Sequence, residues 1–366
     1  MVATKVYNFS PGPGVLFDDV LTQINNELLN WNGMGISILE LNHRSIEFKD
    51  LLGKTKDSLR KLASIPDDFD ILFVQGGATQ AFSSIPLNFC EQDDTVDYIV
   101  NGYWSQFAAT EAKKFANVNI CNTDSDYYYK CPEQSSLNIS PNAKYVHYCA
   151  NETIHGCEFQ YVPDVGGKPL ICDMSSNFLS KPIQHIERYG MIYAGSHKNV
   201  GPPGMVVIII RKDMLNRHRT DVPLMLNYTE IQSHNSTLNS PPVFNIYFAY
   251  LTFQHILKNG GLSEMQKRNE EKADLLYTMI ENSDGFYHYK MDRDCKSKMN
   301  VPFSLRNEAD EQNFLQEAKS KGLIGLDGHH TVGHCRASLY NAMSKKGVQQ
   351  LIDFMNIFYH KTHKNK

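Results

Sequence analysis

The chain has 366 residues, and its composition excludes several classes of protein. At about 150 residues per domain the length predicts roughly two domains, and a 42% share of apolar residues is enough to fill their cores, which excludes a disordered chain. The 36 Lys and Arg residues are balanced by 40 Asp and Glu residues, for a net charge of -4. Without a basic excess, nucleic acid and anionic membranes are not expected as partners.

The most apolar run, residues 205–210, has the length of a strand and falls well short of the roughly 20 residues that span a bilayer. The N-terminus shows no charged and then apolar leader. The eight cysteines form no CxxC pair and lie mostly in apolar runs, so we expect reduced core thiols rather than a disulfide framework. The Asn-x-Ser/Thr triplets are then chance matches. We expect a cytoplasmic protein without a metal site.

The predicted elements begin with a helix. After the loop of residues 8–14, apolar residues recur at helical spacing from Val20 to Leu29, and Gly33 follows as a stop. A second helical stretch, residues 107–115, lies among short apolar runs that read as buried strands. These runs are residues 71–74, 98–100, 145–148, 170–172, 191–194 and 205–210. The alternation of strands and helices predicts a mostly parallel sheet covered by helices.

The pattern changes in the last third of the chain. A long helical stretch starts near Asn245 and ends at Gly260 and Gly261, and a short strand is expected at residues 299–303. The last helix carries apolar residues from Val348 to Phe358 on one side. We expect the basic tail, residues 360–366, to be a frayed terminus. This region predicts a second, smaller α+β domain.

The turn of residues 195–204 places Lys198 among glycines and prolines, between two strongly apolar strands. A lysine in a turn is usually a solvated surface residue. Glycines on both sides, however, allow the backbone to approach a ligand closely. Desolvation in such a place lowers the pKa of an amine toward the nucleophilic form that a Schiff base requires.

Asp173 ends the apolar strand 170–172, and at the carboxyl end of a parallel strand its carboxylate faces the crevice where ligands bind. A carboxylate there can hold a pyridine nitrogen in its protonated form. The alternative is that Asp173 only caps the following turn through Ser175 or Ser176.

The predicted strand 71–74 runs into residues 75–80, where two glycines precede a predicted helix. Backbone N–H groups and a helix N-terminus then converge on one spot, which is suited to an anion. The turn lacks the third glycine of a dinucleotide fold, and a plain tight turn is the alternative. Trp104 follows the next strand, where it either stacks on a flat ring or belongs to the core.

A phosphate cradle, a stacking aromatic, a carboxylate and a lysine therefore occur in this order at successive strand ends. Pyridoxal 5′-phosphate requires all four groups. The lysine binds its aldehyde, the carboxylate keeps the ring an electron sink, and the cradle anchors the phosphate. We expect this cofactor.

At this point the chain resembles the phosphoserine aminotransferases, a family of fold type I pyridoxal-phosphate enzymes, over essentially its whole length. The blocks that carry the resemblance are residues 8–13, 31–35, 43–44, 102–104, 151–154, 198–199, 299–303 and 336–338. The resemblance implies a mostly parallel, seven-stranded sheet in a large domain, residues 16–258. Residues 1–15 and 259–366 would form the smaller domain.

The resemblance also implies roles for individual residues. Lys198 would form the Schiff base, Asp173 would pair with the pyridine nitrogen, and Trp104 would stack on the ring. The other expected cofactor contacts are Ala78, Thr79, Thr153, His197, Asn239 and Ser240. Of these, Asn239 and Ser240 would reach the cofactor phosphate of the neighbouring subunit, which implies a homodimer.

For the substrate, the resemblance places Arg336 on the α-carboxylate, since its planar fork matches a planar acid. His43, Arg44 and His329 would face the substrate phosphate or the γ-carboxylate of glutamate, and Ser10 is expected at the substrate site as well. An ion pair at the surface is the alternative for Arg336, and a solvated turn is the alternative for His329.

Two positions depart from the family pattern. Thr79 stands where many bacterial members carry an arginine that holds the substrate phosphate, so one positive charge is missing. His197 stands where the family often has glutamine, and it adds a group that titrates near neutrality. We therefore expect phosphate binding to depend on pH.

The expected reaction is reversible transamination between phosphoserine with 2-oxoglutarate and 3-phosphohydroxypyruvate with glutamate, in serine biosynthesis. Two alternatives remain open. One is another fold type I reaction, such as alanine–glyoxylate transamination. The other is a pyridoxal-binding module without transaminase activity.

Overall fold

The computed structural model describes residues 5–122, 127–217 and 219–363. The largest sheet within these residues has seven strands in the order β2-β10-β9-β8-β5-β3-β4. Their bounds are β2 Phe69–Gln75, β3 Thr95–Tyr98, β4 Asn117–Ile120, β5 Val146–Cys149, β8 Leu170–Asp173, β9 Tyr189–Gly195 and β10 Met205–Arg211. Only β10 runs against its neighbours in this sheet. The predicted mostly parallel, seven-stranded sheet is confirmed.

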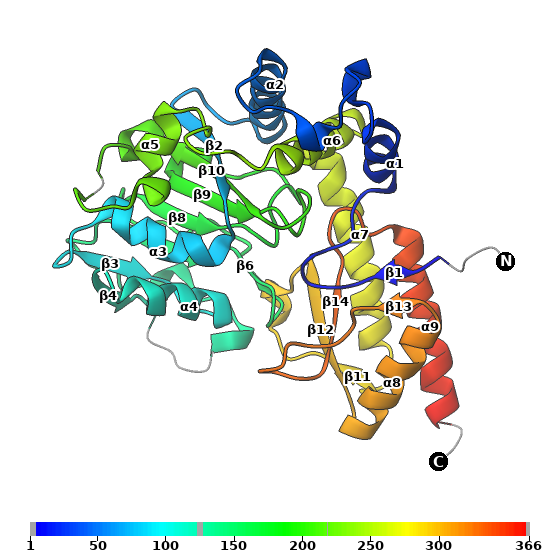
Figure 1. Ribbon diagram of the computed structural model, residues 1–366. Helices are drawn as coiled ribbons and strands as arrows, with labels where there is room; N and C mark the ends of the chain where they lie inside the picture. The colour runs from blue at the N-terminus through cyan, green and yellow to red at the C-terminus, as the bar shows by residue number, and fades with distance from the viewer. Residues whose placement is uncertain (1–4, 123–126, 218, 364–366) are drawn as a thin grey trace.

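Both faces of this sheet are buried, which explains the unbroken apolar run in β10. Val207 and Ile209 belong to the core beneath α2 and α6, whereas Val206 and Ile208 belong to the core beneath α3 and α4. Figure 1 shows these two helix pairs on opposite sides of the sheet. The helices of this part are α1 Asp18–Glu27, α2 Ile46–Ala63, α3 Ala78–Phe89, α4 Tyr103–Ala112, α5 Tyr228–Ser233 and α6 Val243–Lys258.

The C-terminal elements gather beside the large sheet, to its right in Figure 1. They are the helices α7 Gly261–Glu281, α8 Glu308–Ser320 and α9 Lys345–His363, the antiparallel strands β11 Tyr287–His288, β12 Asn300–Leu305 and β14 Cys335–Ser338, and the parallel pair β1 Tyr7–Asn8 and β13 Leu323–Ile324. Tyr7 and Phe9 share a hydrophobic core with these elements. The domain boundaries after residues 15 and 258 stay a prediction.

Three sequence expectations need correction. The edge strand β4 escaped prediction because it carries only two apolar residues and is not fully buried. The first helix ends at Glu27, so Leu29 lies outside it with an 82% exposed side chain. The expected frayed tail is wrong for residues 360–363, which continue α9, and residues 364–366 lie outside the described part.

The cysteines and the lengths of the helices can be compared with what the composition predicts. All eight cysteines are free, and seven of them are buried, as expected for reduced core thiols. No helix in residues 5–122, 127–217 or 219–363 is both long and apolar enough to cross a membrane.

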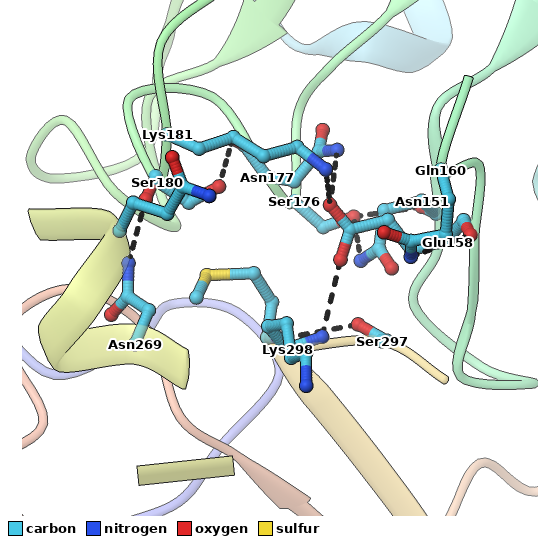
Figure 2. A network of polar contacts seen from close by, with 12 residues as sticks. Asn151, Glu158, Gln160, Ser176, Asn177, Ser180, Lys181, Asn269, Ser297 and Lys298 are labelled. Atoms are coloured by element: carbon cyan, nitrogen blue, oxygen red, sulfur yellow. Dashed lines mark hydrogen bonds and ion pairs between the residues drawn. The ribbon is translucent and has the colours of Figure 1, made fainter. Parts of the chain in front are cut away.

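A buried carboxylate joins the two parts of the chain (Figure 2). Glu158 lies in the short strand β7 Cys157–Glu158, which pairs with β6 Asn151–Glu152. Its Oε1 lies 2.8 Å from Lys181 Nζ and accepts a hydrogen bond from Asn177. Its Oε2 accepts the backbone N–H of Lys298 at 3.1 Å, just before β12.

We expect Glu158→Ala to lower the free energy of unfolding by about 3 kcal/mol, because three donors lose their acceptor in a buried place. Urea denaturation followed by circular dichroism measures this change. The matched control is Glu317→Ala, which removes an exposed pair with Lys361 and should cost less than about 1 kcal/mol. Equal losses in the two variants would contradict the interpretation of the Glu158 network.

Candidate active site

A cavity of about 320 Å³ opens at the carboxyl ends of the parallel strands, between the large sheet and β14. Segments far apart in the sequence meet there. Nine of the residues singled out from the sequence line it: Ala78, Thr79, Trp104, Thr153, Asp173, His197, Lys198, His329 and Arg336. The parallel arrangement explains the meeting, because β2, β5, β8 and β9 all end at this edge.

Lys198 follows β9 in the turn that leads to β10, and it is buried rather than solvated. Its Nζ donates a hydrogen bond to Thr153 Oγ1 at 2.9 Å. Burial lowers the pKa of the Lys198 amine, and the nearby Asp173 carboxylate opposes this shift. The amine is therefore held in a place that favours its neutral, nucleophilic form.

Asp173 is the last residue of β8 and is 5% exposed. One oxygen, Oδ1, accepts the backbone N–H of Ser175 at 2.8 Å, so the capping contact considered from the sequence is present. The side chain lines the cavity as well. Burial raises the pKa of this carboxyl, and the charge of Lys198 opposes the shift. A cationic ring nitrogen beside it would favour the ionised form.

The glycine turn leads directly into α3, whose first residues are Ala78 and Thr79. Gly77 precedes them as the N-cap without any side chain to satisfy the first amides. First-turn N–H groups have no partner within their own helix, and the helix dipole adds positive potential at the same point. The arrangement suits a phosphate group, with Thr79 contributing no charge.

Trp104 lies in the first turn of α4, one turn earlier than the helix expected at residues 107–115. The centroid of its ring is 6.0 Å from Lys198 Nζ, and its Nε1 is buried without a hydrogen-bond partner among the described residues. Buried indole N–H groups normally find a partner. The orphaned group marks the cavity as a place for a ligand with an acceptor.

Arg336 lies in the middle of β14 and is only 4% exposed. Its Nε is likewise buried and has no partner in the part of the chain that the structure describes. His329 lies beside it at the cavity, with its ring 5.3 Å from the ring of Tyr103. Burial lowers the pKa values of both Arg336 and His329. Its burial excludes a surface ion pair for Arg336, and the buried guanidinium suits a carboxylate.

The expectation that His197 titrates near neutrality needs correction. Its imidazole is enclosed by Gly12 and Gly195, at each of which a Cβ atom would press against the ring. Burial and the neighbouring Lys198 lower the pKa of His197 to about 4. The residue is therefore neutral near pH 7, and it contributes no titration of the expected kind there.

Five of the expected residues do not line this cavity: Ser10, His43, Arg44, Asn239 and Ser240. The backbone N–H of Ser10 donates to Asn8 Oδ1. Arg44 is exposed in the turn before α2, and Asn239 and Ser240 are exposed near Gln75, whose side chain donates to the Ser240 carbonyl. Their roles stay predictions.

Several cavity residues escaped the site prediction, among them Cys149, Asn151 and Ser176. Asn151 Nδ2 donates to Ser176 Oγ and to Asn300 Oδ1, which ties the strand ends to β12. The signal that was available is their position, since Cys149 ends β5 and the other two follow the end of a buried strand within three residues.

These groups fit pyridoxal phosphate. The buried amine suits an aldehyde, the carboxylate suits a ring nitrogen, and the α3 N-terminus suits a phosphate. The unpaired indole N–H is a further donor for an acceptor on the ligand.

Comparison with known proteins agrees with this geometry. Residues 6–351 match the family model described as aminotransferase class-V. The chain is 45% identical to a phosphoserine aminotransferase of Chromobacterium violaceum over 97% of this chain and 98% of the relative. It is 44% identical to the chloroplastic phosphoserine aminotransferase 1 of Arabidopsis thaliana, over 97% of this chain and 82% of the relative.

Solved structures lead to the same family. The pyridoxal-phosphate-bound phosphoserine aminotransferase of Trichomonas vaginalis superposes with a TM-score of 0.91 at 37% identity, covering 96% of this chain and 100% of that one. The alanine–glyoxylate aminotransferase of Nostoc sp., at 18% identity and a TM-score of 0.77, shares the fold alone, over 98% of this chain and 96% of that one. The chain belongs to the phosphoserine aminotransferases, within the class-V, pyridoxal-phosphate-dependent aminotransferases.

Proposed function

We propose that this chain reversibly transfers the amino group between phosphoserine and 2-oxoglutarate, with 3-phosphohydroxypyruvate and glutamate as the products, in serine biosynthesis. The observation that carries the proposal is the common cavity of Lys198, Asp173, Trp104 and Arg336. When bound, pyridoxal phosphate supplies the electron sink that stabilises negative charge at the substrate Cα.

The residues of the chain hold the substrate and move its proton. Arg336 binds the α-carboxylate through its guanidinium, whose Nε has no partner among the described residues, and so fixes the orientation of the Cα–H bond. The Lys198 amine takes the proton from Cα of the amino acid that is consumed and gives a proton to Cα of the amino acid that is formed in the reverse half-reaction. Its lowered pKa favours the neutral amine that can accept this proton. Thr153 Oγ1 accepts from Lys198 Nζ and keeps the amine directed into the cavity.

We further propose that the site is completed by a second copy of the chain. Arg44 lies between segments that expose large apolar side chains, with exposed fractions of 63% at Leu39 and 77% at Ile46. Leu29, which is 82% exposed, belongs to the neighbouring segment. Apolar surface of this kind suits an interface, and a two-fold dimer brings the same segment of each copy to its partner. Arg44, His43, Asn239 and Ser240 then serve the partner's cavity. A cytoplasmic location stays a prediction from the sequence.

Arg44→Ala should raise the KM for phosphoserine at least about tenfold, because a charge-assisted bond to a phosphate dianion is lost and Thr79 supplies no replacement. Glutamate, with a single negative charge at that end, should lose less. Steady-state kinetics with both substrates measure the difference. Equal losses for the two substrates would assign the phosphate to another residue.

Mixed dimers test which copy Arg44 serves. A dimer of one Lys198→Ala chain and one Arg44→Ala chain, isolated with two affinity tags, should have about half of the wild-type activity, because one of its two sites keeps both residues. The assay uses phosphoserine well below the wild-type KM, where the Arg44→Ala homodimer is slow. If Arg44 serves its own chain, neither site is intact, and the mixed dimer has only about half of the low activity of the Arg44→Ala homodimer.

The absorbance spectrum of the cofactor-loaded protein tests the reaction itself. Glutamate alone should convert the bound cofactor from its aldehyde form to its amine form, and 3-phosphohydroxypyruvate should restore the first spectrum. A module that binds the cofactor without transamination shows neither change. Conversion by alanine but not by glutamate would contradict the proposed substrate pair.

A further inference from the structure

Glu152 is a fully buried carboxylate next to the proposed active site, and none of the roles described above uses it. It is the last residue of β6, and its exposed fraction is 0%. Oε2 accepts the backbone N–H of Trp104 at 3.0 Å. Oε1 accepts both the backbone N–H and the hydroxyl of Ser105, each at 2.7 Å.

These contacts place the carboxylate at the N-terminus of α4. The N-cap there is Gly102, which has no side chain to satisfy the first amides of the helix. A Cβ atom at Gly102 would overlap the Glu152 carboxylate, so the glycine leaves the space that Glu152 fills. A negative charge at a helix N-terminus is also favoured by the helix dipole.

Glu152 is also the neighbour in the chain of Thr153, one of the proposed cofactor contacts. Thr153 follows it directly, and Thr153 Oγ1 accepts from Lys198 Nζ at 2.9 Å. Glu152 therefore links the backbone of Trp104 to the end of β6, directly before Thr153, across 48 positions of the sequence. The two elements that bring Trp104 and Thr153 to the cavity are held together by one carboxylate.

We propose that Glu152 is a positioning residue, which sets the place of the Trp104 indole against the cofactor ring by fixing the first turn of α4. The inference rests on the proposed function insofar as Trp104 contacts the cofactor. A carboxylate that merely capped a helix would contribute to stability and leave the affinity for the cofactor unchanged.

The experiment uses the Trp31→Phe background, because Trp31 and Trp104 are the two tryptophans of the chain and Trp104 then becomes the sole indole reporter. Glu152→Gln keeps the shape of the side chain but replaces one acceptor oxygen with an NH₂ group that faces backbone N–H donors. The quantities to measure are the Kd for pyridoxal phosphate, the quenching of Trp104 emission on cofactor binding, and kcat and KM for glutamate.

We expect the Kd for pyridoxal phosphate to rise about tenfold, as for a loss of one charge-assisted bond, and quenching to decrease. kcat should fall while the KM for glutamate changes less than threefold, since Arg336 is untouched. The matched control is Asp97→Asn. Asp97 is also buried and accepts from Asn119 and from the Ser140 backbone, but it does not line the cavity. It should lower stability and leave the Kd and quenching as they are.

Ser105→Ala provides a milder variant if Glu152→Gln does not fold, because it removes one of the three bonds to Glu152 and should raise the Kd about threefold. A wild-type Kd and wild-type quenching in the folded variant would overturn the positioning role. Absence of quenching in the Trp31→Phe parent itself would instead overturn the proposed contact of Trp104 with the cofactor. Both readouts need no substrate, so they remain decisive even if the proposed reaction fails.

Discussion

Lys198→Ala is expected to abolish transamination and leave the fold intact. The Lys198 side chain ends in the cavity, where its single hydrogen-bond partner among the described side chains is Thr153 Oγ1, so its removal leaves little unsatisfied. The same amine both binds the cofactor aldehyde and moves the Cα proton, and no other lysine of the described residues lines the cavity. We expect kcat to fall at least about a thousandfold, or roughly 4 kcal/mol of barrier.

Single-turnover absorbance with glutamate measures this loss, and circular dichroism checks the fold. The control is Lys49→Ala, an exposed lysine of α2 whose replacement should leave both unchanged. Turnover comparable to the wild type in Lys198→Ala would assign the chemistry to another residue.

Asp173→Asn is expected to lower kcat by several orders of magnitude with the cofactor still bound. The amide oxygen can still accept the Ser175 N–H that Asp173 Oδ1 accepts at 2.8 Å, so the turn after β8 is preserved. What is lost is the negative charge that keeps the pyridine nitrogen protonated and the ring an electron sink. Burial strengthens this charge effect, because the site screens it less than water does.

Steady-state kinetics at saturating substrate measure kcat for this variant, and Asp97→Asn again serves as the control for a buried carboxylate outside the cavity. A change in kcat of less than about tenfold, equivalent to roughly 1.4 kcal/mol of barrier, would reduce Asp173 to a cap of its turn.

The sequence by itself determined the elements whose pattern is local. The run from Met205 to Ile210 predicted a strand buried on both faces, and the structure packs alternate residues of β10 against two different cores. The residues of the turn marked the place of Lys198 between two buried strands, which the structure has as β9 and β10. The glycines at 195 and 201, however, leave room for the His197 ring and for Phe248 rather than for a ligand. The cofactor, the family and the reaction class followed from such local blocks.

Only the tertiary structure decided which of these residues share a site and what their surroundings do to them. The sequence places Lys198 next to His197, but the larger cause of the lowered pKa of His197 is burial, which only the tertiary structure shows. Glu152 met Trp104 only because β6 and α4 pack together, and Arg44 was separated from the cavity of its own chain. Contacts between distant segments, and the desolvation they cause, arise from packing, which no local pattern encodes.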